Sequence, residues 1–168
     1  MDKVKKDRII LFEASGNVQF ADDFLHRFHT HIFCHRGSAS FVFNDKSYKS
    51  KAGEFVFWLA DSRLADLTFS KNFKATVLLV ERDFLNANIP DQSWSIDAFL
   101  HSKENPVLHL SNKNDKQRVL SNFQLLNHKF LETEHSFYNE VLKLQMQLFI
   151  FTMTLRMEIQ NQTCDILA

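Results

Sequence analysis

The stretch SASFVFNDKSYKSKAGEFVFWLA, residues 38–60, indicates the fold most clearly. It contains short runs of Val, Phe, Tyr and Trp, the residue types that are enriched in β-strands. Asn44 and Asp45 are typical of a tight turn between two such runs, and Gly53 precedes a third run at residues 54–59. The stretch therefore predicts a meander of antiparallel strands.

Similar runs occur on both sides of this stretch, from about residue 9 to residue 110. They are separated by turn-forming segments such as SGN, NDKS and SKAG. The run ATVLLVE at residues 75–81 is almost continuously apolar, which favours a strand that is covered on both faces. Many short strands at close spacing predict a mainly β region over residues 1–110, folded as a sandwich or a barrel.

The hydrophobic period changes after the segment NPVLHL, which ends at Leu110. Apolar residues then recur at the spacing of one face of an α-helix; they are Val119, Phe123, Leu126 and Phe130. Asn112 or Ser111 is a suitable N-cap, because either side chain can accept a hydrogen bond from the first helical turn. The pattern predicts an amphipathic helix after the β region.

A second helix with two apolar stripes is predicted after Ser136. One stripe consists of Phe137, Val141, Leu144, Leu148, Phe151 and Leu155, and the other of Leu142, Met146, Phe149, Met153 and Met157. The short link ETEHS predicts an antiparallel helical hairpin over residues 111–168. The two stripes are wider than one helix can cover, so they either form core or join two subunits. The residues expected at such a homodimer interface are Leu142, Leu144, Leu148, Phe149, Phe151 and Met153.

Size and composition exclude several classes of protein. The chain has 168 residues, 45% hydrophobic and 24% charged, with few Gly and Pro, as expected for one folded unit with an appendage. Its formal net charge is zero, so no general attraction to DNA or to an anionic membrane is expected. Two cysteines and an N-terminus without a secretory signal predict a cytoplasmic protein. Residues 142–157, the most apolar window, are interrupted by polar residues and predict no membrane span.

The segment FHTHIFCHRG, residues 28–37, contains three histidines, all at odd-numbered positions. Residues two apart on a strand share a face, so His29, His31 and His35 are expected to point to the same side. The spacing resembles the first metal motif of the cupin superfamily, and imidazoles can bind zinc or iron. The second cupin motif is absent, because Leu64 stands where its histidine would fall. We therefore predict a site without metal, and a small metal-dependent cupin enzyme using the three histidines is the alternative.

The predicted ligand pocket combines these histidines with aromatic residues of neighbouring strands: His29, His31, Phe33, His35, Phe41, Phe43, Phe55 and Phe57. The same histidines could instead face solvent on an edge strand or be ordinary core residues. The chain contains no nucleophile elbow, phosphate-binding loop, dinucleotide fingerprint or CxxC pair. No catalytic residue and no cofactor are therefore predicted.

The order of these features resembles the N-terminal sensor and dimerisation domain of AraC-family transcription regulators, of the type common in Bacteroidetes. The resemblance rests on FHTHIFCHRGSASFVFNDKSYKSKAGEFVFW, on ATVLLVERDFL and on NPVLHL followed by paired helices, and it covers about residues 5–160. It implies a cupin-like barrel, a double-stranded β-helix or jelly roll, that binds a small effector. It also implies a helical hairpin that joins two subunits.

In the AraC family, helix-turn-helix units bind the DNA. The chain ends at Ala168, soon after the second helix, so the resemblance predicts that this region is missing here. A further alternative is a pure assembly module, in which side chains fill the barrel and no ligand binds.

Overall fold

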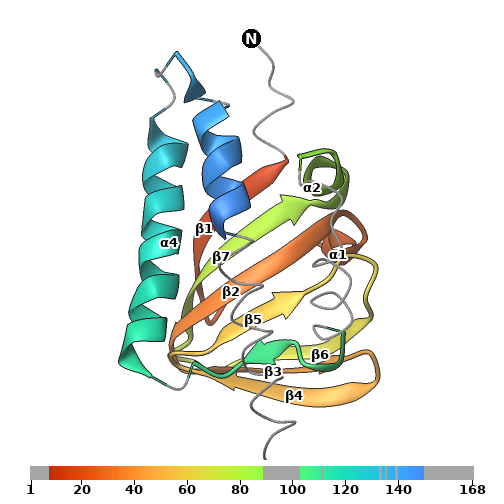
Figure 1. Cartoon of the computed structure of the whole chain (residues 1–168). Coiled ribbons are helices and arrows are strands. Elements are labelled where there is room, and N and C mark those ends of the chain that lie inside the picture. Colours follow the sequence, from red (N-terminus) through yellow and green to blue (C-terminus); the bar gives the residue numbers. More distant parts are fainter. Residues whose placement is uncertain are drawn as a thin grey trace, which may run out of the picture.

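The structure is a computed structural model that describes residues 8–88, 103–110, 112–132, 134, 136–138 and 140–149. In this part of the chain two antiparallel β-sheets face each other, and helices pack on the outer face of the larger sheet (Figure 1). The prediction of a mainly β fold with antiparallel strands and some helices is confirmed.

The larger sheet has five strands in the order β1-β7-β2-β5-β8. Their bounds are Ile9–Ser15 for β1, Phe28–Arg36 for β2, Phe55–Trp58 for β5, Lys74–Glu81 for β7 and Val107–Leu108 for β8. β7 lies between β1 and β2, and its residues from Ala75 to Val80 are all buried. A strand that is buried on both faces needs apolar side chains at nearly every position. This explains the ATVLLVE run and confirms the prediction made for it.

The smaller sheet has three strands in the order β4-β3-β6, with β3 at Ser38–Phe43, β4 at Lys46–Lys51 and β6 at Leu64–Phe69. β3 and β4 form a hairpin whose two loop residues are Asn44 and Asp45. Both have positive φ, at 48° and 67°. A type I′ turn requires this at both positions, and Asn and Asp tolerate it better than most residues. The predicted tight turn is confirmed.

The predicted meander is wrong for its third strand. After the hairpin the chain crosses to the larger sheet, where β5 pairs with β2 and β8. Phe55, Val56 and Trp58 are buried, so β5 needs cover on both faces, and the middle of the larger sheet provides it. Gly53, at the turn between the sheets, has a φ of 83°, a conformation in which a residue with a side chain would be strained.

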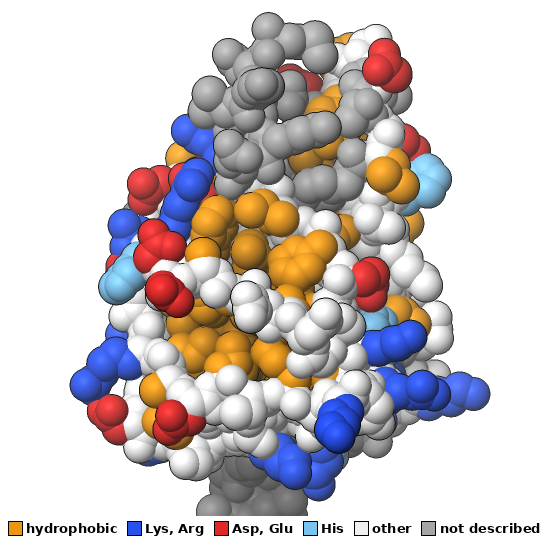
Figure 2. Space-filling model, turned by 180° about the vertical axis from the view of Figure 1, so that it is seen from behind, with side chains coloured by type: hydrophobic (Ala, Val, Ile, Leu, Met, Phe, Trp, Pro, Cys, Tyr) orange, Lys and Arg blue, Asp and Glu red, His pale blue; other side chains and the backbone are white. Residues whose placement is uncertain are grey.

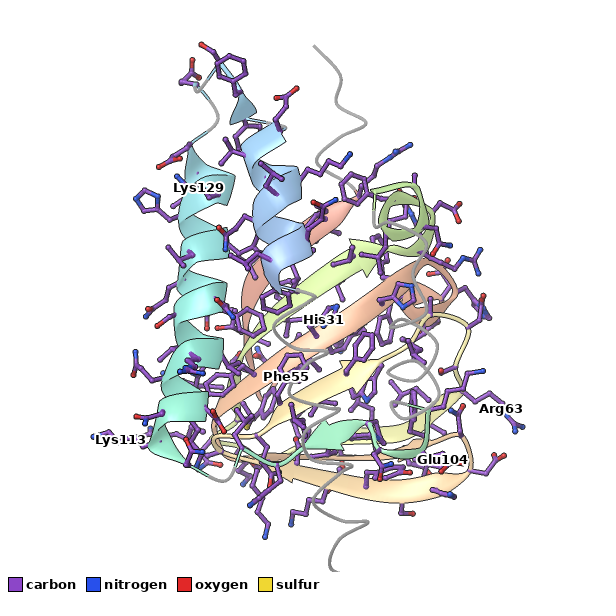
Figure 3. The ribbon with its side chains drawn as sticks, viewed as in Figure 1. His31, Phe55, Arg63, Glu104, Lys113 and Lys129 are labelled. Carbon is purple, nitrogen blue, oxygen red and sulfur yellow. The ribbon has the colours of Figure 1, made fainter. Side chains whose placement is uncertain are left out.

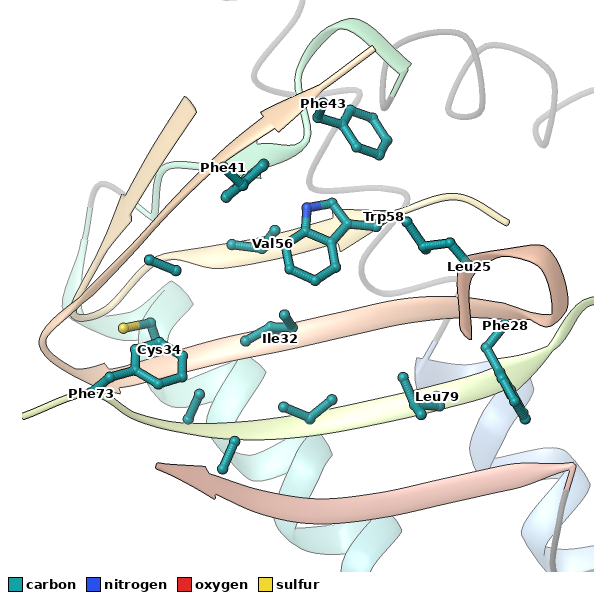
Figure 4. Close-up of a cluster of buried hydrophobic side chains, with 14 residues drawn as sticks. Leu25, Phe28, Ile32, Cys34, Phe41, Phe43, Val56, Trp58, Phe73 and Leu79 are labelled. Atoms are coloured by element: carbon teal, nitrogen blue, oxygen red, sulfur yellow. The ribbon is translucent and has the colours of Figure 1, made fainter. Parts of the chain in front are cut away.

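Two apolar clusters occupy the two faces of the larger sheet. The inner cluster lies between the sheets, where Phe43, Trp58 and Phe73 pack with aliphatic side chains of β2, β5 and β7 (Figure 4). The outer cluster lies between the larger sheet and the helices and includes Phe123 and Phe149. The larger sheet is therefore the middle layer of three.

The loop between β1 and the short helix α1, Phe24–Arg27, covers part of the inner cluster. Phe20 of this loop stacks on Phe24 with ring centroids 4.6 Å apart, and its ring contacts Trp58 edge to face at 6.2 Å.

Seen from the side opposite to Figure 1, apolar side chains reach the surface in the middle of the molecule, and charged side chains lie mainly around them (Figure 2).

Helix α4, Lys113–Leu131, begins at Asn112. The side-chain oxygen Oδ1 of Asn112 accepts a hydrogen bond from the backbone N–H of Asp115 at 2.9 Å. The predicted apolar face of the helix is buried against the sheet through Val119, Phe123 and Leu126. The N-cap at Asn112 is confirmed, as is the apolar face at Val119, Phe123 and Leu126, whereas the side chain of Phe130 lies outside what the structure describes.

A second helical stretch, residues 140–149, lies beside α4 on the same side of the larger sheet (Figure 1). Another short helix, α2 at Arg82–Asn88, follows β7 directly. None of the helices in the described part of the chain is long and apolar enough to cross a membrane.

Replacing Asn112 by Ala is expected to lower the free energy of unfolding by about 1 kcal/mol, because the N–H of Asp115 loses its acceptor. Urea denaturation followed by circular dichroism measures this change. Asn114→Ala, at an exposed position in the same helical turn, is the matched control and should cause no loss. Equal stability of the two variants would show that the cap contributes nothing.

Candidate functional site

The larger sheet separates the predicted pocket residues into two groups. Alternate residues of β2 point to opposite faces of the sheet. The group on the helix side consists of His29, His31, Phe33, Phe55 and Phe57, with His35 beside Phe33 at the far end of β2. The group between the two sheets consists of Phe41 and Phe43. The histidines of β2 therefore lie under the helices and not inside the sandwich, and the predicted residues do not share one cavity.

His31 is enclosed by aromatic rings. It stacks on Phe57 with centroids 4.5 Å apart and an interplanar angle of 16°, and it meets the edge of Phe149 at 5.4 Å. The side chain is 2% exposed, and neither ring nitrogen has a hydrogen-bond partner among the described residues. Burial, with a smaller effect of nearby His29, lowers the pKa of His31 to about 3. His31 is thus a neutral residue of the outer core at pH 7 (Figure 3).

His29 lies near the start of β2 and has one fixed hydrogen bond. The backbone N–H of Ala60 donates to its Nδ1 at 3.2 Å. In the neutral imidazole the proton is therefore on Nε2, which becomes a donor. Burial, together with a smaller effect of Arg82 and against the opposing effect of Asp61, lowers the pKa of His29 to about 4. The ring is neutral at pH 7 and experiences a positive potential from Arg82.

His35 lies at the other end of β2 and is exposed. Its Nε2 is 2.7 Å from Oγ1 of Thr76, whose hydroxyl donates to Oε1 of Glu13 at 2.6 Å. A hydroxyl has a single hydrogen, so Thr76 must accept the Nε2–H of His35. These hydrogen bonds join β2, β7 and β1.

The three histidines have different surroundings, and their arrangement does not fit a metal site. His31 is sealed among aromatic rings, and His35 is bonded to Thr76. Within the described ranges no group of three His, Cys, Asp or Glu side chains could hold a metal ion. The geometry therefore gives no support to the alternative of a metal-dependent enzyme using His29, His31 and His35.

A pocket of about 520 Å³ lies where β2 begins, beside the loop after β5 and helix α2. We call it the β2 pocket. Its lining comes from separate segments of the chain: His29, Asn44, Ala60, Asp61, Ser62, Arg63, Arg82, Asn86 and Lys103. Only His29 was among the residues predicted from the sequence. Arg63 lies at the edge of the molecule, on the side away from α4 (Figure 3).

Ion pairs hold the charged side chains of the β2 pocket. Arg82 pairs with Asp61, and Arg63 pairs with Asp45 through its Nη2 at 2.5 Å. The loop that carries Asp61 and Arg63 is itself held by Asn44, whose Oδ1 accepts the backbone N–H of Arg63 at 3.2 Å. The two arginines of the pocket are therefore positioned by contacts within the protein.

The predicted interface residues of the second helix also divide into two groups. Phe149 is buried in the outer cluster, and Leu142 packs against that cluster. Leu144 and Leu148 are 63% and 53% exposed, on a different side of the helix. Phe151 and Met153 lie outside the described residues. Phe137, Leu125 and Leu131 are further large apolar residues with high exposure.

No protein-family model and no curated protein matches the chain. Solved structures do match it. The AraC-like transcriptional activator CuxR aligns with a TM-score of 0.56 and 10% identity, over 89% of this chain and 48% of that one. A variant of apo ToxT from Vibrio cholerae aligns with a TM-score of 0.45 and 14% identity, over 89% of this chain and 56% of that one.

The chain thus spans about half the length of these structural neighbours. At 10% identity the likeness to CuxR concerns the fold and not individual residues. The chain has the fold of the part of an AraC-like transcriptional activator that it matches.

Proposed function

We propose that the chain is the small-molecule-sensing and dimerisation domain of an AraC-type transcription regulator, with DNA binding assigned to a helix-turn-helix region outside these 168 residues. The observation that carries the proposal is the shared fold with about half of CuxR, a protein described as an AraC-like transcriptional activator. In this proposal residues 1–110 form a cupin-like sensor barrel and residues 111–168 a helical hairpin. The role requires no catalytic group.

The dimer interface in this proposal is the exposed apolar stripe of the second helix, through Leu144 and Leu148. Their side chains are more than half exposed, whereas Met146 and Phe149 of the same helix are buried against the sheet. Leucines exposed to this extent in one row favour contact with a partner surface. A two-fold axis would bring the same stripe from both subunits together.

Leu144→Asp is expected to convert a dimer into a monomer without unfolding the chain. The aspartate would place an unpaired charge in the apolar interface, at a position that is 63% exposed in one subunit. Light scattering coupled to size exclusion measures the mass, and circular dichroism reports the fold. We expect the dissociation constant to rise about a hundredfold or more, which corresponds to roughly 3 kcal/mol.

Two further variants make the test specific. Lys143→Asp introduces the same side chain at the neighbouring exposed position and should leave the dimer intact. Met146→Asp places a charge in the outer cluster and should unfold the protein. A wild-type chain that is monomeric at high micromolar concentration would contradict the dimerisation role.

We assign the sensing role to the β2 pocket, because a row of rings connects it to the second helix. His29 lines the pocket, and its ring lies 6.2 Å from Phe57, which stacks on His31, which in turn contacts Phe149. A ligand that shifts His29 would therefore act on the helix through direct contacts. Such a ligand can shift the dimer from one arrangement of its subunits to another only if it binds the two arrangements with different affinity.

A further inference from the structure

We propose that the end of the sandwich at which β2 is followed by β3 contacts the phosphate backbone of DNA and adds affinity that does not depend on base sequence. We call this region the basic end. Its exposed cationic residues are Arg36, Lys49, Lys51, Lys71, Lys74, Lys113 and Lys116. The inference rests on the proposed function, because that role would hold the domain beside DNA.

Strand pairing brings cations of three strands together at the basic end. Arg36 of β2 and Lys74 of β7 are direct partners in the larger sheet. Lys51 of β4 is opposite Ser38, which follows Arg36 by two residues. The Cβ atoms of directly opposite residues lie about 5 Å apart, and like charges at such positions destabilise a sheet. The fold thus accepts a repulsive pair at Arg36 and Lys74.

A loop and a helix add further cations at the same end. Ser70, next to Lys71, donates its backbone N–H to the carbonyl oxygen of Ser38 at 3.0 Å. Its Oγ accepts the N–H of Ser38 at 2.9 Å. Nζ of Lys116 lies so close to Gly53 that a Cβ atom at that position would be 3.0 Å away. Figure 2 shows a group of Lys and Arg side chains at the lower right of the molecule.

The charge of the basic end is not balanced locally. Within the described ranges none of its seven cationic side chains forms an ion pair. The same segments carry three carboxylates: Glu13, Glu54 and Asp115. Glu13 accepts the hydroxyl of Thr76, and Glu54 is buried and accepts the backbone N–H of Lys51. The basic end therefore keeps an excess of positive charge.

The other end of the sandwich differs, because its arginines have carboxylate partners. The pairs are Arg8 and Arg27 with Glu81, Arg63 with Asp45 and Arg82 with Asp61. The formal net charge of zero thus conceals an uneven distribution. The expectation that the chain as a whole does not attract DNA leaves room for a local positive potential at the basic end.

The residue types of the basic end favour phosphates over a protein surface. Six of its seven cations are lysines, which are depleted in protein–protein interfaces, where aromatic residues are enriched. The large apolar side chains that are exposed in the described part of the chain lie elsewhere: Leu125, Leu131, Phe137, Leu144 and Leu148. Contacts to the DNA backbone need only positive charge at accessible positions.

The test is a titration of the full chain into a fluorescently labelled DNA duplex of arbitrary sequence, followed by anisotropy. We expect saturable binding with a dissociation constant of about 100 µM or below at about 50 mM salt. If about three phosphates are contacted, the affinity should fall about twentyfold between about 50 and about 150 mM salt.

The double variant Arg36→Gln, Lys74→Gln is expected to bind the duplex about tenfold or more weakly at low salt and to reduce the salt slope by about two. Both positions are exposed, so circular dichroism should show an unchanged fold. The matched control removes two charges at a distance, as Lys129→Gln, Lys143→Gln. Lys129 lies at the opposite end of α4 from Lys113 (Figure 3), and the control should bind as the wild type does.

Three outcomes would overturn the inference: no binding to the duplex at low salt, equal weakening by the two double variants, or an affinity that salt does not change. Vesicles containing phosphatidylserine and poly-glutamate are the competing probes. Tighter binding to either would assign the basic end to an anionic membrane or to an acidic protein segment instead. Light scattering separates the two proposals: a dimer that ignores the duplex contradicts this inference alone, whereas a monomeric wild type contradicts the dimerisation role.

Discussion

Acidification from about pH 7.5 to about pH 5 is expected to lower the free energy of unfolding by about 4 kcal/mol through His29 and His31 alone. In the folded chain the pKa of His29 is about 4 and that of His31 is about 3, below the ordinary value of 6.5. The unfolded chain therefore binds these two protons more readily. The contribution to stability is complete above pH 6.5 and is lost as the pH falls from there toward 4 and 3.

Urea denaturation at the two pH values measures this effect. Carboxylates also respond to pH, so the decisive comparison is with His31→Leu, which replaces a buried ring having two unpaired nitrogens by an apolar side chain of similar size. On acidification, we expect the free energy of unfolding of this variant to fall by about 2 kcal/mol less than that of the wild type. Gln124→Leu, at an exposed position of α4 and without a titratable group, should lose as much as the wild type does. If His31→Leu and the wild type lose the same free energy of unfolding on acidification, His31 does not titrate as its burial requires.

Phe123→Ala is expected to lower the free energy of unfolding by about 3 to 5 kcal/mol, the range for removing a buried aromatic ring. The side chain is 2% exposed, and its ring lies 4.9 Å from Phe149, 6.3 Å from Phe55 and 6.5 Å from Phe33. It thus contacts both the sheet and the second helix. Urea denaturation at neutral pH measures the loss.

Leu125→Ala is the matched control for this prediction. Leu125 lies on the same helix but is 49% exposed, so its truncation should change the free energy of unfolding by no more than about 0.5 kcal/mol in a monomer. If Phe123→Ala costs less than about 1 kcal/mol, α4 does not depend on the outer cluster for its position.

Local patterns in the sequence were sufficient for several elements. The helical spacing of Val119, Phe123 and Leu126 predicted the buried face of α4, and Asn112 is its N-cap. Asn44 and Asp45 predicted the turn between β3 and β4, because few residues adopt positive φ at two successive positions. Each of these features is decided by residues that are close together in the chain.

The face of β2 that lies inside the sandwich could not be predicted. Alternation predicted that His29 and His31 share a face, and the structure agrees. However, every residue from Phe28 to Cys34 is buried, because the strand has core on both sides. A strand of this kind carries no contrast between an apolar and a polar face, so the sequence cannot distinguish its inner side from its outer side.

The β2 pocket and the division of the second helix escaped prediction for related reasons. The pocket lining comes from loops that are distant in the chain, such as the one at Arg63 and helix α2 at Arg82, and no periodic pattern links them. On the second helix, Leu144 and Phe149 are both strongly apolar, although one is exposed and the other is buried. The position of the sheet decides between them, and that position depends on long-range packing.

The edge strand β4 has a consequence for self-assembly. In the described part of the chain β4 pairs on one side only, with β3, so backbone groups on its other side could accept a strand from another molecule. Lys46, Lys49 and Lys51 are exposed along this edge. Two copies that met there in antiparallel fashion would bring their ammonium groups close together, so the lysines disfavour edge-to-edge association.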